Sequence, residues 1–126
     1  EQATTGATAP EFLDILRSDP NPGWRAAKVP VLGLFGGKDT QVPADVNAAP
    51  MTADLAGVPD SQVVTLPDAN HLFQSATTGS PNEYGMLDQA FTPDFLPLVV
   101  GWVAARTGLP APSFAPLPSP AASPAG

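Results

Sequence analysis

The feature that most constrains the fold of this chain is an apolar run over residues 29–35 that stops at Gly36-Gly37. The run is mostly aliphatic and carries no charge. A continuous apolar run, as opposed to an alternating one, is typical of a strand that is buried on both faces of a sheet. The two glycines break the strand and let the backbone turn tightly. Asp39 follows at the carboxyl end of the predicted strand, which is where open parallel sheets place their chemistry.

Beyond Asp39 the sequence alternates between predicted helices and one more strand. A helix is predicted over residues 44–56, with Met51 and Leu55 facing the sheet, and a second buried strand over residues 61–66. A last helix begins near Asp94 and has an apolar face whose residues recur at helical spacing: Phe95, Leu98, Val99, Trp102 and Val103. This order of elements predicts an α/β fold with two parallel strands and flanking helices.

The remaining segments are predicted to be short or irregular. An amphipathic helix over residues 11–17 is ended by the prolines of segment 19–23, because proline cannot continue a helix. Residues 72–91 form a long connection with a turn at Gly79-Ser80-Pro81. Residues 1–10 are expected to be a flexible leading segment, and residues 109–126 a disordered or extended tail rich in Pro, Ala and Ser. The folded part is therefore expected to span residues 11–108.

Length and charge narrow the class of protein. A chain of 126 residues suffices for one small domain. Its net charge of −7 argues against nucleic acid or an anionic membrane surface as a partner, because both require basic patches. No apolar run approaches the roughly 20 residues of a membrane span. There is no cysteine, no histidine and carboxylate cluster with metal-ligand spacing, and no glycine-rich phosphate loop. We therefore expect no metal or cofactor, and the composition indicates no particular cell compartment.

The two predicted strands point to a larger fold. Two parallel strands do not make a stable sheet by themselves, and their apolar faces and open edges need further strands beside them. The sequence is therefore interpreted as the carboxyl-terminal part of a larger α/β domain.

One pair of residues carries the main chemical hypothesis. His71 is the only histidine and ends the loop after the second predicted strand. Because Asp39 also follows a parallel strand, the fold is expected to bring both side chains to the same edge of the sheet. An aspartate beside a histidine fixes the tautomer of the ring and stabilises the imidazolium during proton transfer. We predict that Asp39 and His71 are a catalytic pair. Asp68 is an alternative acid, although a turn-forming role suits it better.

Around these two residues the chain resembles a known family. Residues 28–43 (KVPVLGLFGGKDTQVP) resemble the acid-bearing segment of serine α/β-hydrolases, whose usual form is PVL-x-x-x-G-x-x-D-x-x-VP. Residues 66–74 (LPDANHLFQ) are similar to their histidine loop, and residues 78–84 and the helix around Trp102 resemble the esterase and serine-aminopeptidase-like branch. The resemblance covers about residues 12–106. It implies the carboxyl-terminal portion of an α/β-hydrolase fold, with Asp39 as triad acid and His71 as triad base.

The nucleophile of that family has no counterpart in this sequence. The serine of such hydrolases lies in a G-x-S-x-G motif ahead of the aspartate and the histidine. The motif does not occur here, and the serines at 18, 61, 75 and 80 lack it. The resemblance implies that a serine on an amino-terminal part of the same fold attacks an ester, thioester or amide carbonyl. His71 would move the proton and Asp39 would orient His71. The chain alone is expected to be inactive.

Three hypotheses about function stay open. The first is a carboxylesterase-like serine hydrolase that takes a small ester or amide substrate. The second is a truncated, non-catalytic domain that associates through its open sheet edge. The third is a peptidase or thioesterase of the same fold. Other roles are also open: Asn70 as a brace of the histidine loop, Glu83 and Asp88 as solvated charges, and Phe73 and Tyr84 as pocket lining or packing.

Overall fold

The computed structural model describes Asp14, residues 18–110 and Ser113. Its elements follow one another in the order α3 (Asn21–Arg25), β1 (Leu32–Gly36), α4 (Ala44–Asp54), the 3-10 helix η1 (Leu55–Gly57), β2 (Gln62–Leu66), the 3-10 helix η2 (Pro81–Met86) and α5 (Phe95–Thr107). The helix expected over residues 11–17 lies outside the described residues except for Asp14, which is helical. The expected leading segment lies wholly outside them, and the expected tail does so except for residues 109–110 and Ser113.

The centre of the fold is a parallel two-stranded sheet, as predicted. β1 pairs with β2 in a register that sets Leu32 beside Gln62 and Gly36 beside Leu66. β1 begins later than the apolar run does, because Pro30 has no amide N–H and the N–H of Val31 is donated to the hydroxyl of Ser61 (2.9 Å). The arrangement is compatible with an α/β fold.

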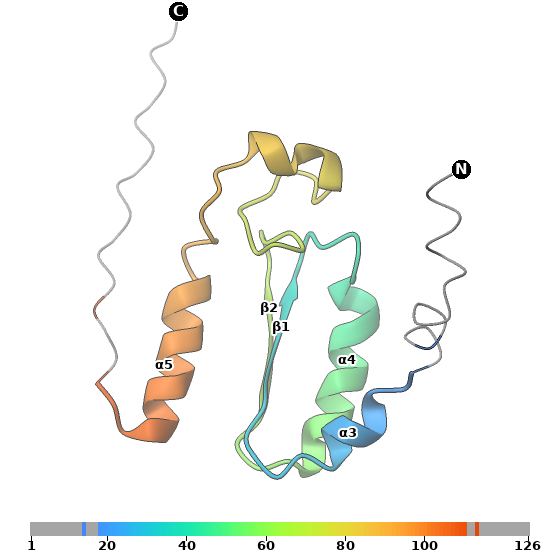
Figure 1. Ribbon diagram of the computed structural model, residues 1–126, viewed down its shortest axis with the longest axis vertical. Helices are drawn as coiled ribbons and strands as arrows, with labels where there is room; N and C mark the ends of the chain where they lie inside the picture. The colour runs from blue at the N-terminus through green and yellow to red at the C-terminus, as the bar shows by residue number, and fades with distance from the viewer. Residues whose placement is uncertain (1–13, 15–17, 111–112, 114–126) are drawn as a thin grey trace, which may run out of the picture.

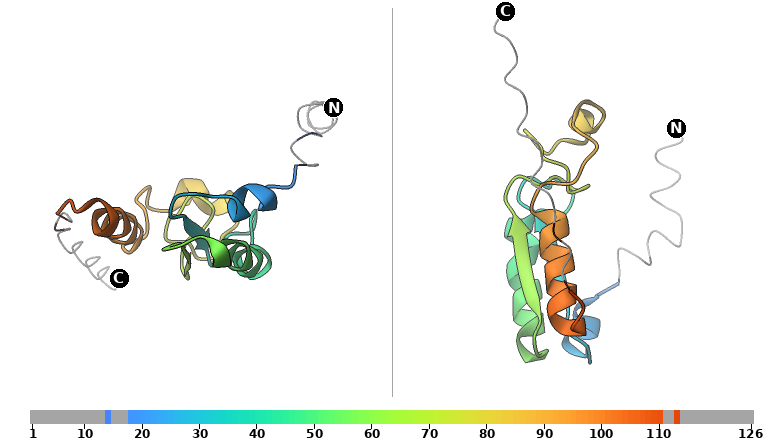
Figure 2. Two further views of the ribbon diagram at one scale, coloured as in Figure 1. Left: turned by 90° about the horizontal axis from the view of Figure 1, so that it is seen from below. Right: turned by 90° about the vertical axis from the view of Figure 1, so that its left-hand side faces the viewer.

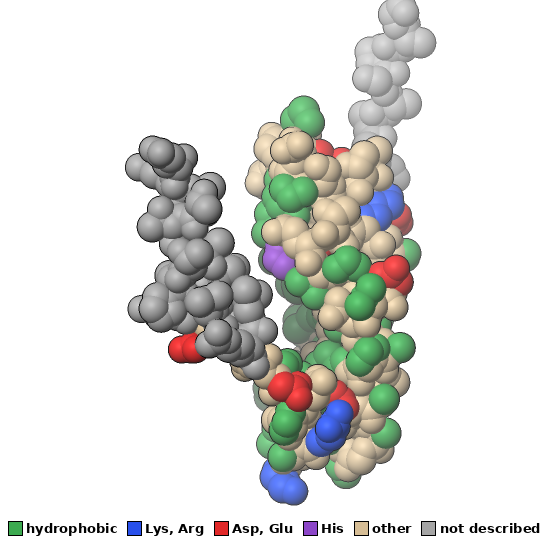
Figure 3. Space-filling model, turned by 90° about the vertical axis from the view of Figure 1, so that its right-hand side faces the viewer, with side chains coloured by type: hydrophobic (Ala, Val, Ile, Leu, Met, Phe, Trp, Pro, Cys, Tyr) green, Lys and Arg blue, Asp and Glu red, His purple; other side chains and the backbone are tan. Residues whose placement is uncertain are grey.

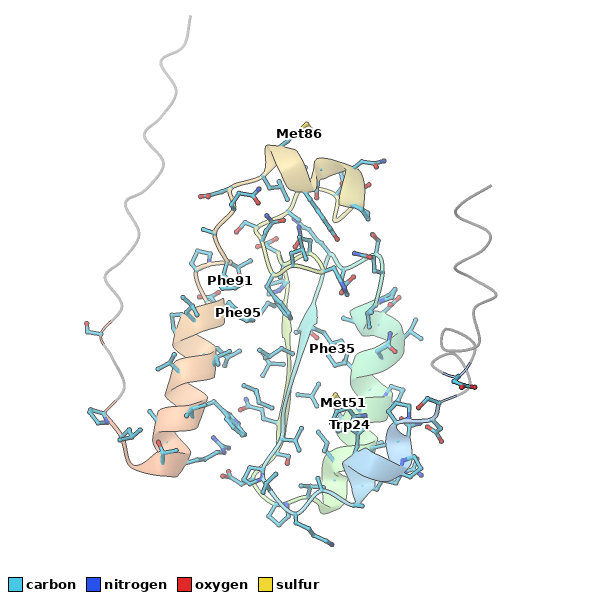
Figure 4. The ribbon with its side chains drawn as sticks, viewed as in Figure 1. Trp24, Phe35, Met51, Met86, Phe91 and Phe95 are labelled. Atoms are coloured by element: carbon cyan, nitrogen blue, oxygen red, sulfur yellow. The ribbon has the colours of Figure 1, made fainter. Side chains whose placement is uncertain are left out.

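The helices lie on the two sides of this sheet. α4 covers one side and α5 lies on the other, with η2 above the carboxyl ends of the strands (Figures 1 and 2). Met51 of α4 lies over Gly33, where an added Cβ would come within 2.8 Å of its sulfur. Leu55 and Val58, which follow α4, are buried. Figure 4 shows Met51 near Phe35 and Trp24 on the α4 side of the sheet. Met51 faces the sheet as predicted, whereas Leu55, predicted in the same helix, is buried in η1 because α4 ends at Asp54.

The prediction that both strands are buried on both faces is wrong for the described residues. In β1 only Gly33 and Gly36 are buried, and in β2 only Leu66 is. The physical reason is that the sheet has just two strands in the described part of the chain and that α5 is not closely packed on it. A cavity of about 520 Å³, lined in part by Leu66 and Thr92, separates the end of β2 from the start of α5.

One proline-containing segment also differs from the sequence-based expectation. Segment 19–23 was expected only to break a helix, but Pro20 is the N-cap of α3 and Pro22 lies in its first turn. The fixed φ of proline suits a first turn, where the missing N–H costs nothing. Pro50 lies inside α4 without ending it.

The last helix begins at the predicted place. Asp94 is the N-cap residue, although its side chain makes no capping hydrogen bond, and Gly108 ends α5 with a φ of 69°. The apolar face of α5 is half-buried at most, and Val103 is 43% exposed. Arg106 stacks on Trp102 at 3.8 Å and donates to the carbonyl (2.8 Å) and carboxylate (2.9 Å) of Asp60. These contacts fasten the end of α5 to the turn before β2.

Candidate active site

The glycine pair after β1 allows the loops that carry Asp39 and His71 to lie against each other. A Cβ added to Gly36 would come within 2.5 Å of the carbonyl oxygen of Ala69 and 2.7 Å of that of Asn70. A Cβ on Gly37 would come within 2.6 Å of the Pro67 carbonyl oxygen. The backbone therefore approaches more closely than any larger residue permits.

Backbone hydrogen bonds join the two loops at this point. Gly37 N–H donates to the carbonyl of Leu66 (2.7 Å), and Lys38 N–H donates to that of Ala69 (2.9 Å). The N–H of Asp39 turns back to the carbonyl of Gly36 (3.2 Å). Asp39 thus stands on a tight turn that is hydrogen-bonded to the loop leading to His71.

The histidine loop is built on a fully buried asparagine. Asn70 is 0% exposed, and its Oδ1 accepts the N–H groups of Leu72 (2.9 Å) and Gln74 (3.0 Å). Its Nδ2 donates to Oε1 of Gln74 (3.0 Å). Phe73 adopts a left-handed φ of 57° within this turn. The expectation that Asn70 braces the loop is confirmed.

The structure brings Asp39 and His71 into contact. Oδ2 of Asp39 lies 2.9 Å from Nδ1 of His71. The other oxygen, Oδ1, accepts the N–H groups of Gln41 (2.8 Å) and Val42 (2.9 Å). The carboxylate is 8% exposed, whereas the imidazole is 39% exposed. The space-filling view shows the histidine side chain at the surface (Figure 3).

The surroundings of Asp39 favour its ionised form. Burial raises the pKa of Asp39, but the hydrogen bonds from Val42, His71 and Gln41 together hold this pKa below its ordinary value of 3.8. An ionised carboxylate only accepts hydrogen bonds, so the proton between the two groups belongs to Nδ1 of His71. In the neutral ring this leaves Nε2 as the acceptor. The pair can therefore act as an oriented base.

The alternative acid is not in contact with the histidine. Asp68 is 71% exposed and lies 3.1 Å from Nζ of Lys38. Ser61 accepts the Val31 N–H at the amino end of the strands, and Ser80 accepts the N–H of Asn82. In the part of the chain that the structure describes, no hydrogen bond joins a serine to His71.

One residue contradicts the sequence-based expectation. Glu83, expected to be solvated, is 8% exposed and accepts the N–H groups of Thr78 (3.1 Å) and Gly79 (2.6 Å). Burial raises the pKa of Glu83, but these backbone hydrogen bonds outweigh it and the pKa lies below its ordinary value of 4.5. The sequence signal near this site is the spacing of Ser80 and Glu83, which is that of a helix capping box, although Glu83 binds the N–H groups of Thr78 and Gly79 and the N–H of Ser80 donates to the hydroxyl of Thr78.

The other open residues have packing or hydrogen-bonding roles. Phe73 packs on Phe95, with 4.7 Å between ring centroids. Phe91 packs on Phe95 with 4.5 Å between ring centroids, and Figure 4 labels both of these residues. The hydroxyl of Tyr84 accepts a hydrogen bond from Nε2 of Gln41 (2.8 Å). Asp88 is exposed, as expected.

Comparisons with known proteins give a partial likeness. No protein-family model and no solved structure matches the chain. The chain is 41% identical over 46 residues to a Yersinia pestis protein named "Putative carboxymethylenebutenolidase". The matched stretch is 36% of this chain and 17% of that protein. The chain therefore spans less than two thirds of the length of the curated relative that it matches.

The described residues contain neither a candidate membrane-spanning helix nor a candidate metal site. None of the helices there has the length and apolar character needed to cross a membrane. No group of three or more His, Asp or Glu side chains in that part of the chain is arranged to hold a metal ion.

Proposed function

We propose that this chain supplies the acid and the base of a serine hydrolase that cleaves carboxylic esters by acyl transfer. The observation that carries the proposal is the 2.9 Å contact between Asp39 and His71 at the carboxyl ends of two parallel strands. The similarity to a protein named as a butenolidase adds support, because a butenolide is a cyclic ester.

The chemistry follows from the orientation of the pair. A serine carried by an amino-terminal part of the same fold attacks the substrate carbonyl. Nε2 of His71 takes the serine proton and returns it to the leaving group. Asp39 holds the ring in the required tautomer and stabilises the imidazolium. Water activated by His71 then releases the acyl group. The half-exposed ring leaves Nε2 accessible to such a partner.

The open edge of β1 supports an association with further strands. Val31 and Gly37 hydrogen-bond to β2, so in the alternating pattern of a parallel ladder Leu32 and Leu34 direct their backbone groups to the opposite edge. Near the amino end of β1, Trp24 (37% exposed) and Val29 (66% exposed) line one apolar hollow together with Val31. An additional strand at β1 would satisfy these backbone groups and cover these side chains.

The test uses a protein in which this chain is joined to a segment carrying G-x-S-x-G. Hydrolysis of a short-chain nitrophenyl ester and covalent labelling of the serine by a fluorophosphonate are the two readouts. His71→Ala should abolish turnover, whereas Asp88→Asn, a change at an exposed acid outside the pair, should leave it unchanged. Full turnover by His71→Ala would refute the proposal. Anilide and thioester substrates of the same acyl group then separate an esterase from a peptidase or a thioesterase.

A second function is favoured by the same open edge. A non-catalytic chain of this fold would use the unpaired side of β1 to bind another protein by adding a strand. Strand association without any turnover by the joined protein would support this second function over the first.

A further inference from the structure

We propose that Glu83 is a positioning residue that holds the acid loop, residues 38–41, in the conformation that aims Asp39 at His71. Its consequence for catalysis rests on the hydrolase function proposed above. The geometric part of the proposal concerns the chain itself and does not depend on that function.

The first step is the contact between Glu83 and a tight turn. Oε1 of Glu83 accepts the N–H groups of Thr78 (3.1 Å) and Gly79 (2.6 Å), and Oε2 also lies 3.1 Å from the nitrogen of Thr78. Ser80, the N-cap of η2, accepts the N–H of Asn82 through its side chain. Hydrogen bonds to an ionised acceptor are about twice as strong as neutral ones. The buried carboxylate therefore fixes the turn over residues 77–80.

The second step is the contact between this turn and the acid loop. Gly79 has a φ of 80°, and a Cβ at this position would collide with the carbonyl oxygen of Lys38. The carbonyl of Gly79 accepts the hydroxyl of Thr40 (3.1 Å). The turn thus touches the residues on both sides of Asp39, and a displacement of Gly79 moves the backbone that carries the aspartate.

The third step is a parallel contact from the next residue of η2. The hydroxyl of Tyr84 accepts a hydrogen bond from Nε2 of Gln41. The backbone N–H of Gln41 donates to Oδ1 of Asp39. Lys38 adds a bond from Nζ to the carbonyl of Ala76 (2.8 Å). Residues 76–84 therefore contact the acid loop at several points. Glu83 is the buried residue that orders the turn over residues 77–80, in the middle of this segment.

The geometry is measured by amide hydrogen exchange on the full 126-residue chain. Glu83→Gln keeps one acceptor and loses the charge. We expect it to speed exchange at Thr78 and Gly79, and also at Gln41 and Val42, whose N–H groups bind Asp39. The matched control, Asp88→Asn, removes the same charge from an exposed site and should change none of these four rates.

A second variant keeps the proposal testable if Glu83→Gln does not fold. Thr40→Val removes the hydroxyl that binds the carbonyl of Gly79 but leaves the bonds of Glu83 in place. It should speed exchange at Gln41 and Val42 and spare Thr78 and Gly79. Unchanged rates at Gln41 and Val42 in either folded variant would overturn the proposal.

The joined hydrolase provides the catalytic readout. Glu83→Gln should lower kcat about tenfold with little change in KM, since misplacing a catalytic group costs rate and not substrate binding. Glu83→Ala, which retains no acceptor, should lower kcat further. An equal loss in both variants, or a change in KM alone, would contradict the positioning role. If the joined protein with the unchanged sequence were inactive, the proposed hydrolase function would be refuted. The hydrogen-exchange results would still test whether Glu83 positions the acid loop.

Discussion

The carboxylate of Asp39 contacts His71 with one oxygen and the backbone of its own loop with the other. Oδ2 lies 2.9 Å from Nδ1 of His71, and Oδ1 accepts the N–H groups of Gln41 and Val42 from its own loop. The orientation of the carboxylate is therefore fixed by backbone hydrogen bonds that do not involve the histidine. This arrangement suits an orienting acid and not a nucleophile, because the oxygen facing the solvent-accessible ring is already hydrogen-bonded.

The first prediction concerns the choice between two acids. In the joined hydrolase, Asp39→Asn should lower kcat by about 10⁴, because an asparagine amide favours the wrong tautomer of the ring. Asp68→Asn is the matched control, since Asp68 is exposed and paired with Lys38. Ester hydrolysis at saturating substrate measures both. If the asparagine at 68 caused the larger loss, the acid would have been assigned to the wrong loop.

The second prediction concerns the stability of the fold at low pH. The pKa of Asp39 is held below its ordinary value, because the hydrogen bonds from Val42, His71 and Gln41 outweigh the effect of burial. A carboxyl with a lowered folded-state pKa stabilises the fold above its unfolded pKa, and this contribution is lost as pH falls through the folded value. The free energy of unfolding should therefore fall below about pH 4.

Urea titrations at a series of pH values from about 7 down to about 2 measure this dependence. Asp39→Asn should flatten the acid limb of the profile, and Glu83→Gln should do the same, because the pKa of Glu83 is also lowered. Asp88→Asn serves as the comparison, since Asp88 is exposed. Profiles of Asp39→Asn and Glu83→Gln that are as steep as that of the unmodified chain would argue against the prediction.

The sequence predicts the order of β1, α4, β2 and α5 and the contact between Asp39 and His71, but not α3, η2 or the way in which the two side chains are held in place. The apolar run and the glycines locate β1 and Asp39, since strand burial and tight turns have strong local signals. The sequence signal for the role of Glu83 is its capping-box spacing from Ser80, but this spacing does not show that the carboxylate is buried on the N–H groups of Thr78 and Gly79. The burial of the strands was overestimated because it depends on neighbouring elements and not on the run itself.

The third prediction concerns the close approach of the two loops. Gly36→Ala should destabilise the fold by about 1–3 kcal/mol, because its Cβ would meet the carbonyl oxygens of Ala69 and Asn70. These are backbone atoms and cannot turn aside as a flexible side chain can. Gly57→Ala is the control, since a Cβ there meets nothing within 4 Å. Urea midpoints compare the two, and equal midpoints would show that the loops are further apart than described.

The fourth prediction concerns the buried brace of the histidine loop. Asn70→Ala removes the acceptor of the Leu72 and Gln74 N–H groups and the donor to the Gln74 side chain. Leaving buried polar groups without partners costs about 1–3 kcal/mol, so the urea midpoint should fall. Asn82→Ala, at an exposed asparagine, should leave the midpoint unchanged. Because His71 follows Asn70 directly, the alanine at 70 should also lower kcat in the joined hydrolase even where the protein stays folded. A folded Asn70→Ala protein with unchanged kcat would show that the asparagine stabilises the loop without orienting the histidine.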